Sequence, residues 1–140
     1  MKLIPYLMFR DGKCREAFDF YARALRGEIV RTSTYGEMPM PADAPPMPEA
    51  MRPLIANVHL LAAGAELMGA DGVENADGQA TTTVNIEVAD AAEAERVFAA
   101  MSAGGQVRMP LSETPWAVRF GMFDDRYGQP WMVNCMKPRG

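Results

Sequence analysis

The chain contains 140 residues, of which 49% are hydrophobic and 23% are charged, a composition typical of an ordinary globular protein. A chain of this length can bury a core as one domain without disulfides or a structural metal. Its formal net charge of −4, with lysine and arginine residues scattered along the sequence, excludes the basic surface that a nucleic-acid binder needs. We therefore predict a single domain over residues 1–140 and no nucleic-acid partner.

The N-terminal segment predicts a strand over residues 4–9 and no signal peptide, because Pro5 and Arg10 interrupt any apolar core. No later stretch reaches membrane-spanning length. The two cysteines, Cys14 and Cys135, lie far apart without CxxC spacing, so we interpret them as reduced thiols. These features predict a cytoplasmic protein that has no membrane partner.

An internal repeat organises the chain, since residues 14–31 (CREAFDFYARALRGEIVR) align without a gap on residues 91–108 (AAEAERVFAAMSAGGQVR). In both copies apolar residues recur every three or four positions and a glycine follows, which predicts a helix that ends at a left-handed C-cap and leads into a strand. Asp90 is the expected cap of the second helix, and Asp11 holds a comparable position before the first. The matched pairs include Glu16 with Glu93, Tyr21 with Phe98, Gly27 with Gly104 and Arg31 with Arg108.

Strand patterns surround each predicted helix in the same order. They cover residues 4–9, 28–35, 55–62 and 65–70 in the first half, and 81–88, 106–111, 117–123 and 131–136 in the second. Both halves therefore read βαβββ. We predict an α+β fold of two tandem modules, about residues 1–75 and 78–137, with curved mixed sheets that enclose a cleft.

The segment 37–53 contains four methionines and six prolines, which predicts a long loop instead of a helix or a central strand. It could be a mobile lid over an apolar ligand or an arm across a dimer partner, since methionine adapts to irregular surfaces. It could equally be a simple connector. The sequence leaves these alternatives open.

Several runs resemble the PhnB-like branch of the vicinal oxygen chelate superfamily, which includes glyoxalases, bleomycin-resistance proteins and dioxygenases. The resemblance covers nearly the whole chain, and its most specific runs are WAVRFGM at 116–122 and YGQPWM at 127–132. It implies the glyoxalase/bleomycin-resistance fold, commonly a homodimer, and a cleft that holds a divalent ion in metal-using relatives. The branch often carries a methyltransferase label, but the sequence contains no glycine-rich strand-to-helix turn with a downstream acidic residue to hold a methyl donor.

Strand alternation predicts which side chains line the cleft. In the strand 81–88 it places Thr83 and Asn85 on the face away from the helix, and the repeat relates Thr83 to Tyr6. We assign no catalytic residue. The predicted ligand-binding residues are Tyr6, Met8, His59, Thr83, Asn85, Glu113, Trp116 and Arg119.

Each of these residues has a structural alternative. His59 could act as a general base, or it could make a structural hydrogen bond. Arg119 and Glu113 could bind an anionic or carbonyl group, or they could form an internal ion pair. Trp116 could form an aromatic wall or belong to the core. Cys14 lies in a first helical turn, where the dipole could lower its pKa, but we interpret it as a packing residue.

The resemblance also implies where a metal would bind, namely the first strand of each module and the closing strands. The comparable positions are Tyr6, Thr83, Leu67 or Met68, and Met132, and none is a normal ligand for a divalent ion. We therefore expect no cofactor and no metal. The leading hypothesis is a metal-independent protein that binds an unidentified small molecule. The alternatives are a divalent-metal-dependent glyoxalase-like lyase or dioxygenase-like enzyme, with Glu66, Glu87 or Glu113 beside His59, and a dimeric interaction module without catalysis.

Overall fold

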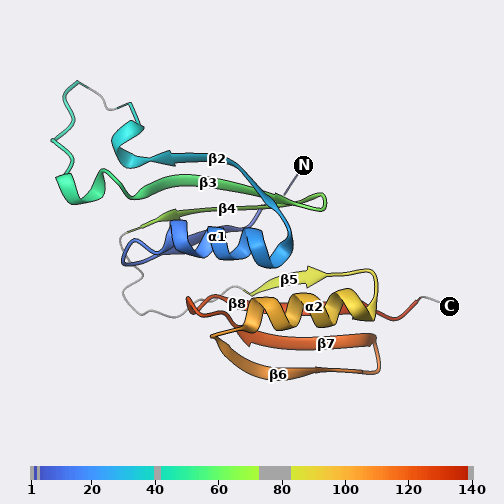
Figure 1. Cartoon of the computed structure of the whole chain (residues 1–140). Helices are drawn as coiled ribbons and strands as arrows, with labels where there is room; N and C mark the ends of the chain where they lie inside the picture. The colour runs from blue at the N-terminus through green and yellow to red at the C-terminus, as the bar shows by residue number, and fades with distance from the viewer. Residues whose placement is uncertain (1, 3, 40–41, 73–82, 139–140) are drawn as a thin grey trace. The chain divides into compact units, whose positions relative to one another are not determined.

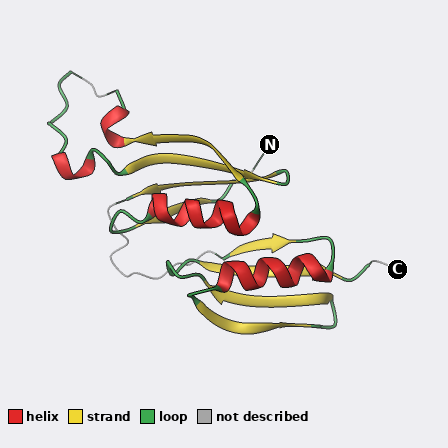
Figure 2. Ribbon diagram, in the orientation of Figure 1, coloured by secondary structure: helices red, strands yellow, loops and turns green. Residues whose placement is uncertain are grey.

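A computed structural model describes residues 2, 4–39, 42–72 and 83–138 (Figure 1). The chain divides into two compact units, Met1–Ala76 and Asp77–Gly140, which we call module one and module two. Among the described residues, each module has one α-helix beside a four-stranded sheet (Figure 2). The predicted α+β fold of two βαβββ modules is thus confirmed. The expected cleft depends on how the modules are placed relative to each other, and it stays a prediction.

Module one contains a mixed sheet in which the first strand is parallel to the last. The strand order is β1-β4-β3-β2, with β1 parallel to β4 and the other neighbours antiparallel. Its elements are β1 (Tyr6–Phe9), α1 (Cys14–Leu25), β2 (Glu28–Thr34), β3 (Ile55–Ala62) and β4 (Ala65–Asp71).

Module two repeats this topology, with the order β5-β8-β7-β6 and a parallel pair between β5 and β8. Residues 81 and 82 of the predicted strand lie outside the described residues. The elements are β5 (Val84–Glu87), α2 (Ala91–Ser102), β6 (Gln106–Ser112), β7 (Ala117–Asp124) and β8 (Pro130–Met136). In the described part of the chain, no helix is long and apolar enough to cross a membrane.

An aromatic side chain of each helix packs onto a glycine of the sheet beneath it. A Cβ atom at Gly69 of β4 would lie 2.6 Å from the Phe18 ring, and one at Gly121 of β7 would lie 2.5 Å from the Phe98 ring. Phe18 is fully buried in module one. The missing side chain therefore lets the helix approach the sheet closely.

The first helix is capped from a distant strand. Asp71, at the end of β4, is 3% exposed and accepts hydrogen bonds from the backbone N–H groups of Cys14 (3.0 Å) and Ile55 (2.9 Å). The cap predicted at Asp11 is wrong, because Asp11 has a positive φ of 56° and Lys13 is the residue that precedes the helix. One carboxylate therefore joins α1, β3 and β4.

The second helix begins as the sequence predicts, since Asp90 accepts a hydrogen bond of 2.8 Å from the Glu93 N–H. The helix ends differ from each other. Gly104 has the expected positive φ of 78°, but after α1 it is Arg26, with φ 54°, that adopts the left-handed conformation. Gly27 is needed instead for close approach, because a Cβ there would lie 2.7 Å from the Leu61 carbonyl oxygen of β3.

The outer strands of both sheets are short or irregular. β1 and β5 have four residues each. The pairing of β2 with β3 and that of β6 with β7 both contain register shifts, and β6 includes Pro110. By contrast, β3 and β4 form a regular hairpin closed by Ala63 and Gly64, whose φ angles of 49° and 85° match a type I′ turn.

The loop between β2 and β3 extends beyond the sheet (Figure 1) and contains neither an α-helix nor a strand among its described residues. It begins and ends with short 3₁₀ helices, Tyr35–Glu37 and Glu49–Met51. Backbone hydrogen bonds from Tyr35 to Leu54 and from Gly36 to Arg52, both 3.0 Å, join its two ends. Residues 40 and 41 lie outside the described part.

Candidate functional site

The face of the first sheet that lies away from α1, which we call the open face of module one, carries several of the predicted residues. In β1, Leu7 is buried, whereas Tyr6 and Met8 are 46% and 59% exposed. In β3, Val58 and Leu60 are buried on the helix side, so Asn57 and His59 lie on the other. Tyr6, Met8, Asn57 and His59 therefore share the open face.

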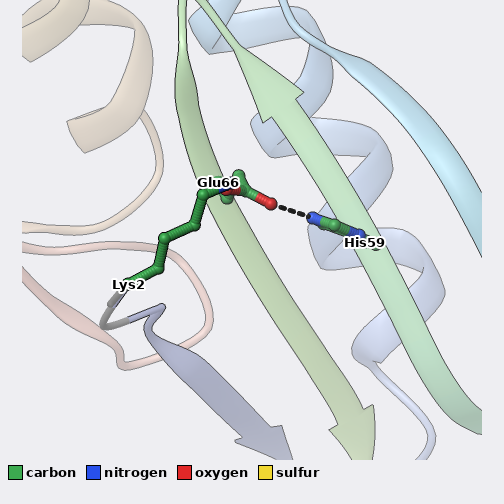
Figure 3. Close-up of polar contacts among 3 residues, drawn as sticks. All are labelled: Lys2, His59 and Glu66. Atoms are coloured by element: carbon green, nitrogen blue, oxygen red, sulfur yellow. Dashed lines mark hydrogen bonds and ion pairs between the residues drawn. The ribbon is translucent and has the colours of Figure 1, made fainter.

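His59 forms a hydrogen bond with a carboxylate on the neighbouring strand. Its Nε2 atom lies 2.9 Å from Glu66 Oε1, and the two side chains are only 19% and 16% exposed. The Lys2 ammonium group contacts the other oxygen of Glu66. Figure 3 shows the Glu66 carboxylate between the two basic groups.

The β3–β4 hairpin brings His59 and Glu66 together. Its turn pairs Ala62 with Ala65, and continuing this register pairs His59 with Met68. Glu66 is two residues from Met68, so it lies on the same face and diagonal to His59. The Ala63-Gly64 turn fixes this register and can be recognised in the sequence. The predicted ligand-binding residues nevertheless do not include Glu66.

The charge of Glu66 determines which tautomer a neutral His59 adopts. The hydrogen bond from Lys2 lowers the pKa of Glu66 below its ordinary value, against the opposing effect of partial burial, and His59 adds to the lowering. An ionised carboxylate only accepts hydrogen bonds, so a neutral His59 must carry its proton on Nε2. Its Nδ1 atom is then an acceptor, which is the requirement for a proton-accepting role.

Tyr6 and Asn57 add polar groups to the same face. The Tyr6 hydroxyl donates to the Ala56 carbonyl oxygen at 3.3 Å and accepts from Asn57 Nδ2 at 3.4 Å. Both contacts are long, so neither group is firmly committed to its partner. The phenol and the amide can therefore reorient toward a ligand.

Arg31, which the predicted site omits, also lies on this face. It is the register partner of His59, which pairs with Met68, and Met68 pairs with Tyr6. These four residues form one row across all four strands of the sheet. Arg31 is exposed and has no hydrogen-bond or ion-pair partner among the described residues. The sequence repeat aligns Arg31 with Arg108, and this match was the sequence signal that could have drawn attention to Arg31.

The module-two residues of the predicted site fall into separate groups. Thr83 and Asn85 are exposed at and just before β5, as alternation predicts. Glu113 follows β6 and forms a 2.9 Å ion pair with Lys137, which lowers the pKa of Glu113. Trp116 is 50% exposed and its ring contacts Phe120 with centroids 5.5 Å apart, so it is not a core residue. Their participation in a ligand site stays a prediction.

Arg119 differs from its predicted place. It pairs in register with the buried Cys135, and its Nε atom lies 3.4 Å from Glu95 Oε1 of α2. Arg119 shares its strand parity with Gly121 and Phe123, which pack on the helix side. The structure therefore places Arg119 on the helix-covered face of module two and not with Asn85.

The donor set does not fit the divalent ion of metal-using relatives. Tyr6 lies beside Met68 and Asn85 beside Met132, and none of these four side chains is an imidazole or a carboxylate. Within residues 2, 4–39, 42–72 and 83–138, no three His, Cys, Asp or Glu side chains are grouped to hold a metal. Only one carboxylate, that of Glu66, converges on His59 among these residues.

Cys14 is a packing residue in the structure. It is fully buried, and this burial, reinforced by the nearby Asp71 carboxylate, raises the pKa of its thiol to about 12. The helix dipole therefore does not produce a reactive thiolate here. Cys14 and Cys135 are both free and buried.

Comparison with known proteins settles the family. The family model described as 3-demethylubiquinone-9 3-methyltransferase, which is of PhnB type, matches residues 1–134. The chain belongs to this PhnB-like family. The resemblance to PhnB-like proteins found in the sequence is thus confirmed. The family description names an activity that no residue arrangement described above supports or requires.

Three relatives span this PhnB-like protein almost completely. Protein YjdN of Escherichia coli is 33% identical over 98% of this chain and 97% of its own length. The crystal structure of protein PA1353 from Pseudomonas aeruginosa is 38% identical, with a TM-score of 0.83 and 99% of both chains covered. A putative 3-demethylubiquinone-9 3-methyltransferase, PhnB protein, from Bacillus cereus is 25% identical, with a TM-score of 0.74 and coverage of 96% and 99%.

Proposed function

We propose that this PhnB-like protein binds a small organic molecule on the open face of module one, with His59 and Glu66 at the centre of the contact surface. The hydrogen bond between these two side chains supports the proposal, because it orients the imidazole of a partly buried histidine. A purely structural pair would need no further acceptor, whereas His59 keeps Nδ1 available among the described residues. Tyr6, Asn57 and Met8 supply further polar and apolar contacts.

The binding requires no resident metal in this proposal. A catalytic divalent ion generally takes at least three protein ligands, and His59 and Glu66 provide two. The alternative, a metal-dependent lyase or dioxygenase-like enzyme, needs a further His or carboxylate ligand at the same place. The two functions therefore differ in whether added metal binds at His59.

We also propose that the protein acts as a cytoplasmic homodimer. Large apolar side chains of module two, including Val107 (46% exposed) and Met109 (43% exposed), support self-association. The two free cysteines agree with a reducing compartment. Sedimentation equilibrium of the purified chain and fractionation of cells test these two assignments, and a monomer or a membrane fraction would contradict them.

The ligand-binding proposal is tested by a fragment screen that observes the imidazole of His59 by NMR. His59 is the only histidine in the sequence, so its signals need no assignment. We expect hits that shift the His59 resonances and raise the unfolding temperature through mass action. His59→Gln should abolish this thermal stabilisation, whereas Arg23→Gln, on the exposed side of α1, should leave it unchanged.

A second experiment with added metal ions distinguishes our proposal from the metal-dependent enzyme. Chelator-treated protein is unfolded thermally with and without Mn²⁺, Fe²⁺, Co²⁺, Ni²⁺ or Zn²⁺. Stabilisation by one ion that disappears in His59→Gln would favour the metal-dependent enzyme over our proposal. Organic fragments that leave His59 unperturbed throughout the screen would refute binding at the open face.

A further inference from the structure

We propose that the ligand is an organic anion whose carboxylate or phosphate group lies between Arg31 and His59. This inference rests on the proposed function, because it names the class of molecule that binds the open face of module one. It adds Arg31 as the residue that determines specificity for charge.

The register of the sheet places a guanidinium group and an imidazole ring side by side. Arg31 of β2 and His59 of β3 are direct partners, so their side chains leave the sheet on the same face. Directly paired residues have Cβ atoms about 4.5–5.5 Å apart, which lets a guanidinium fork and an imidazole ring reach one oxyanion. Glu66 holds the ring from its other nitrogen (Figure 3).

The repeat provides an internal comparison for Arg31. Its counterpart Arg108 donates from Nε to Asp124 Oδ2 at 3.0 Å, and this ion pair neutralises it. Arg108 lies at the register shift between the Val107–Phe123 and Met109–Met122 pairs, whereas Arg31 pairs directly with His59 and contacts no carboxylate among the described residues. The arginine of module one thus lacks the carboxylate that its counterpart has, and a ligand anion can supply one.

The surrounding charges favour an anion at this position. The Glu66 carboxylate is already engaged by Lys2 and His59. Glu28 lies on the same face, but opposite Leu61 and farther along β2. Arg31 is the direct register partner of His59, and its guanidinium has no acidic partner among the described residues.

The rest of the row indicates the body of the ligand. Met68 and Tyr6 continue the row across β4 and β1, and the adjacent Met8 is 59% exposed. Thioether and phenol side chains contact apolar or aromatic groups favourably. The arrangement fits a molecule with an oxyanion at one end and an apolar body that crosses the sheet.

The protonation state of His59 determines how its ring contacts an oxyanion. Neutral His59 presents an Nδ1 lone pair, which repels an oxyanion, whereas the imidazolium donates from Nδ1 and remains bound to ionised Glu66.

The test titrates the full chain with phenyl phosphate, benzoate and the neutral benzyl alcohol, and follows the His59 imidazole by NMR. We expect an anion to bind and to shift the His59 imidazole resonances, and the tighter of the two anions identifies phosphate or carboxylate. Arg31→Gln should weaken this binding about tenfold or more, because a charge-assisted pair is lost. Arg31→Lys, which keeps the charge but loses the planar fork, should lose less affinity.

Arg108→Gln is the matched control and should change the affinity less than about twofold, because Arg108 is already paired. Unchanged thermal unfolding of Arg31→Gln shows that the exposed residue is not needed for folding. Equal affinity for benzyl alcohol and the anions, or full affinity in Arg31→Gln, would overturn the anion proposal while leaving small-molecule binding intact. Failure of both anions to perturb His59 also overturns it, and the fragment screen then decides the proposed function separately.

Discussion

At the scale of single residues, Glu66 combines two interactions of different origin. Its contact with His59 follows from the hairpin register, whereas its contact with Lys2 depends on the path of the N-terminal segment. Both partners favour the ionised carboxylate, and the pKa of Glu66 is accordingly lowered. The group therefore contributes to stability in a pH-dependent way.

We predict that Glu66→Gln removes a pH-dependent part of the stability. A carboxyl group with a depressed folded-state pKa stabilises the fold above its unfolded pKa, about 4.3, and this contribution is lost as pH falls through the folded pKa. Urea unfolding from pH 7 to pH 3 should show the wild type more stable at neutral pH, with the difference closing below about pH 4. A difference that is constant over this range would contradict the assignment.

A second residue-scale prediction concerns the buried Asp125, which is 3% exposed. Its carboxylate accepts hydrogen bonds from the indole of Trp131 at 2.8 Å and from the backbone N–H groups of Tyr127 and Gln129 at 2.8 and 3.0 Å. Asp125→Ala leaves these donors without that acceptor, which should destabilise the protein by about 3 kcal/mol in urea unfolding. Asp19→Ala, at an exposed position of α1, is the control and should cost under about 0.5 kcal/mol.

At the scale of elements, local patterns predict the strands and helices but not the contacts between them. Alternation in β1 correctly exposes Tyr6 and Met8. Alternation in β7 likewise indicates that Arg119 lies on the helix side. The capping of α1 by Asp71 is different, because the two segments are far apart in the sequence. No local pattern connects them, so the expected cap at Asp11 failed.

The same limit applies to the candidate site. His59 was predictable as a strand residue on the face away from the helix, and its link to Glu66 follows once the Ala63-Gly64 turn is recognised. The contact with Lys2 could not be predicted, because no turn connects that residue to β4. Identification of the ligand depends on atoms outside the chain, so no sequence pattern contains it.

The hairpin that positions His59 gives an element-scale prediction. Ala63 adopts a positive φ of 49°, which costs a residue with a Cβ about 1 kcal/mol. Ala63→Asn produces the favoured Asn-Gly turn and should stabilise the protein by about 0.5–1 kcal/mol in urea unfolding. Gly64→Ala, with φ 85° at that position, should act in the opposite direction, and stabilisation by both changes would contradict the type I′ assignment.

At the scale of the whole molecule, the duplicated modules have diverged in their chemistry while keeping their topology. Strand order is the same in both, and each helix places an aromatic ring on a strand glycine, which lies in β4 in module one and in β7 in module two. The open faces differ, because module one carries the His59–Glu66 pair whereas Met122 and Met132 are register partners in module two. Fold could thus be predicted from a repeating pattern, whereas function depends on residues that the repeat does not share.

The division into two units predicts additive energetics. Ala63→Asn acts on a turn of module one and Asp125→Ala on a buried carboxylate of module two. The double variant should therefore change the free energy of unfolding by the sum of the single changes within about 0.5 kcal/mol. An interaction energy above about 1 kcal/mol in the double-mutant cycle would show that the modules are energetically coupled.

The irregular outer strands have a consequence for behaviour at high concentration. A sheet edge with free N–H and C=O groups can recruit strands from other molecules and grow into an aggregate. The edge strands β1 and β5 have only four residues each. The edge strands β2 and β6 pair with register shifts, and Pro110 of β6 has no N–H to donate. We therefore expect the described edge strands to hinder sheet extension from one molecule to the next and so to oppose amyloid-like assembly of the native protein.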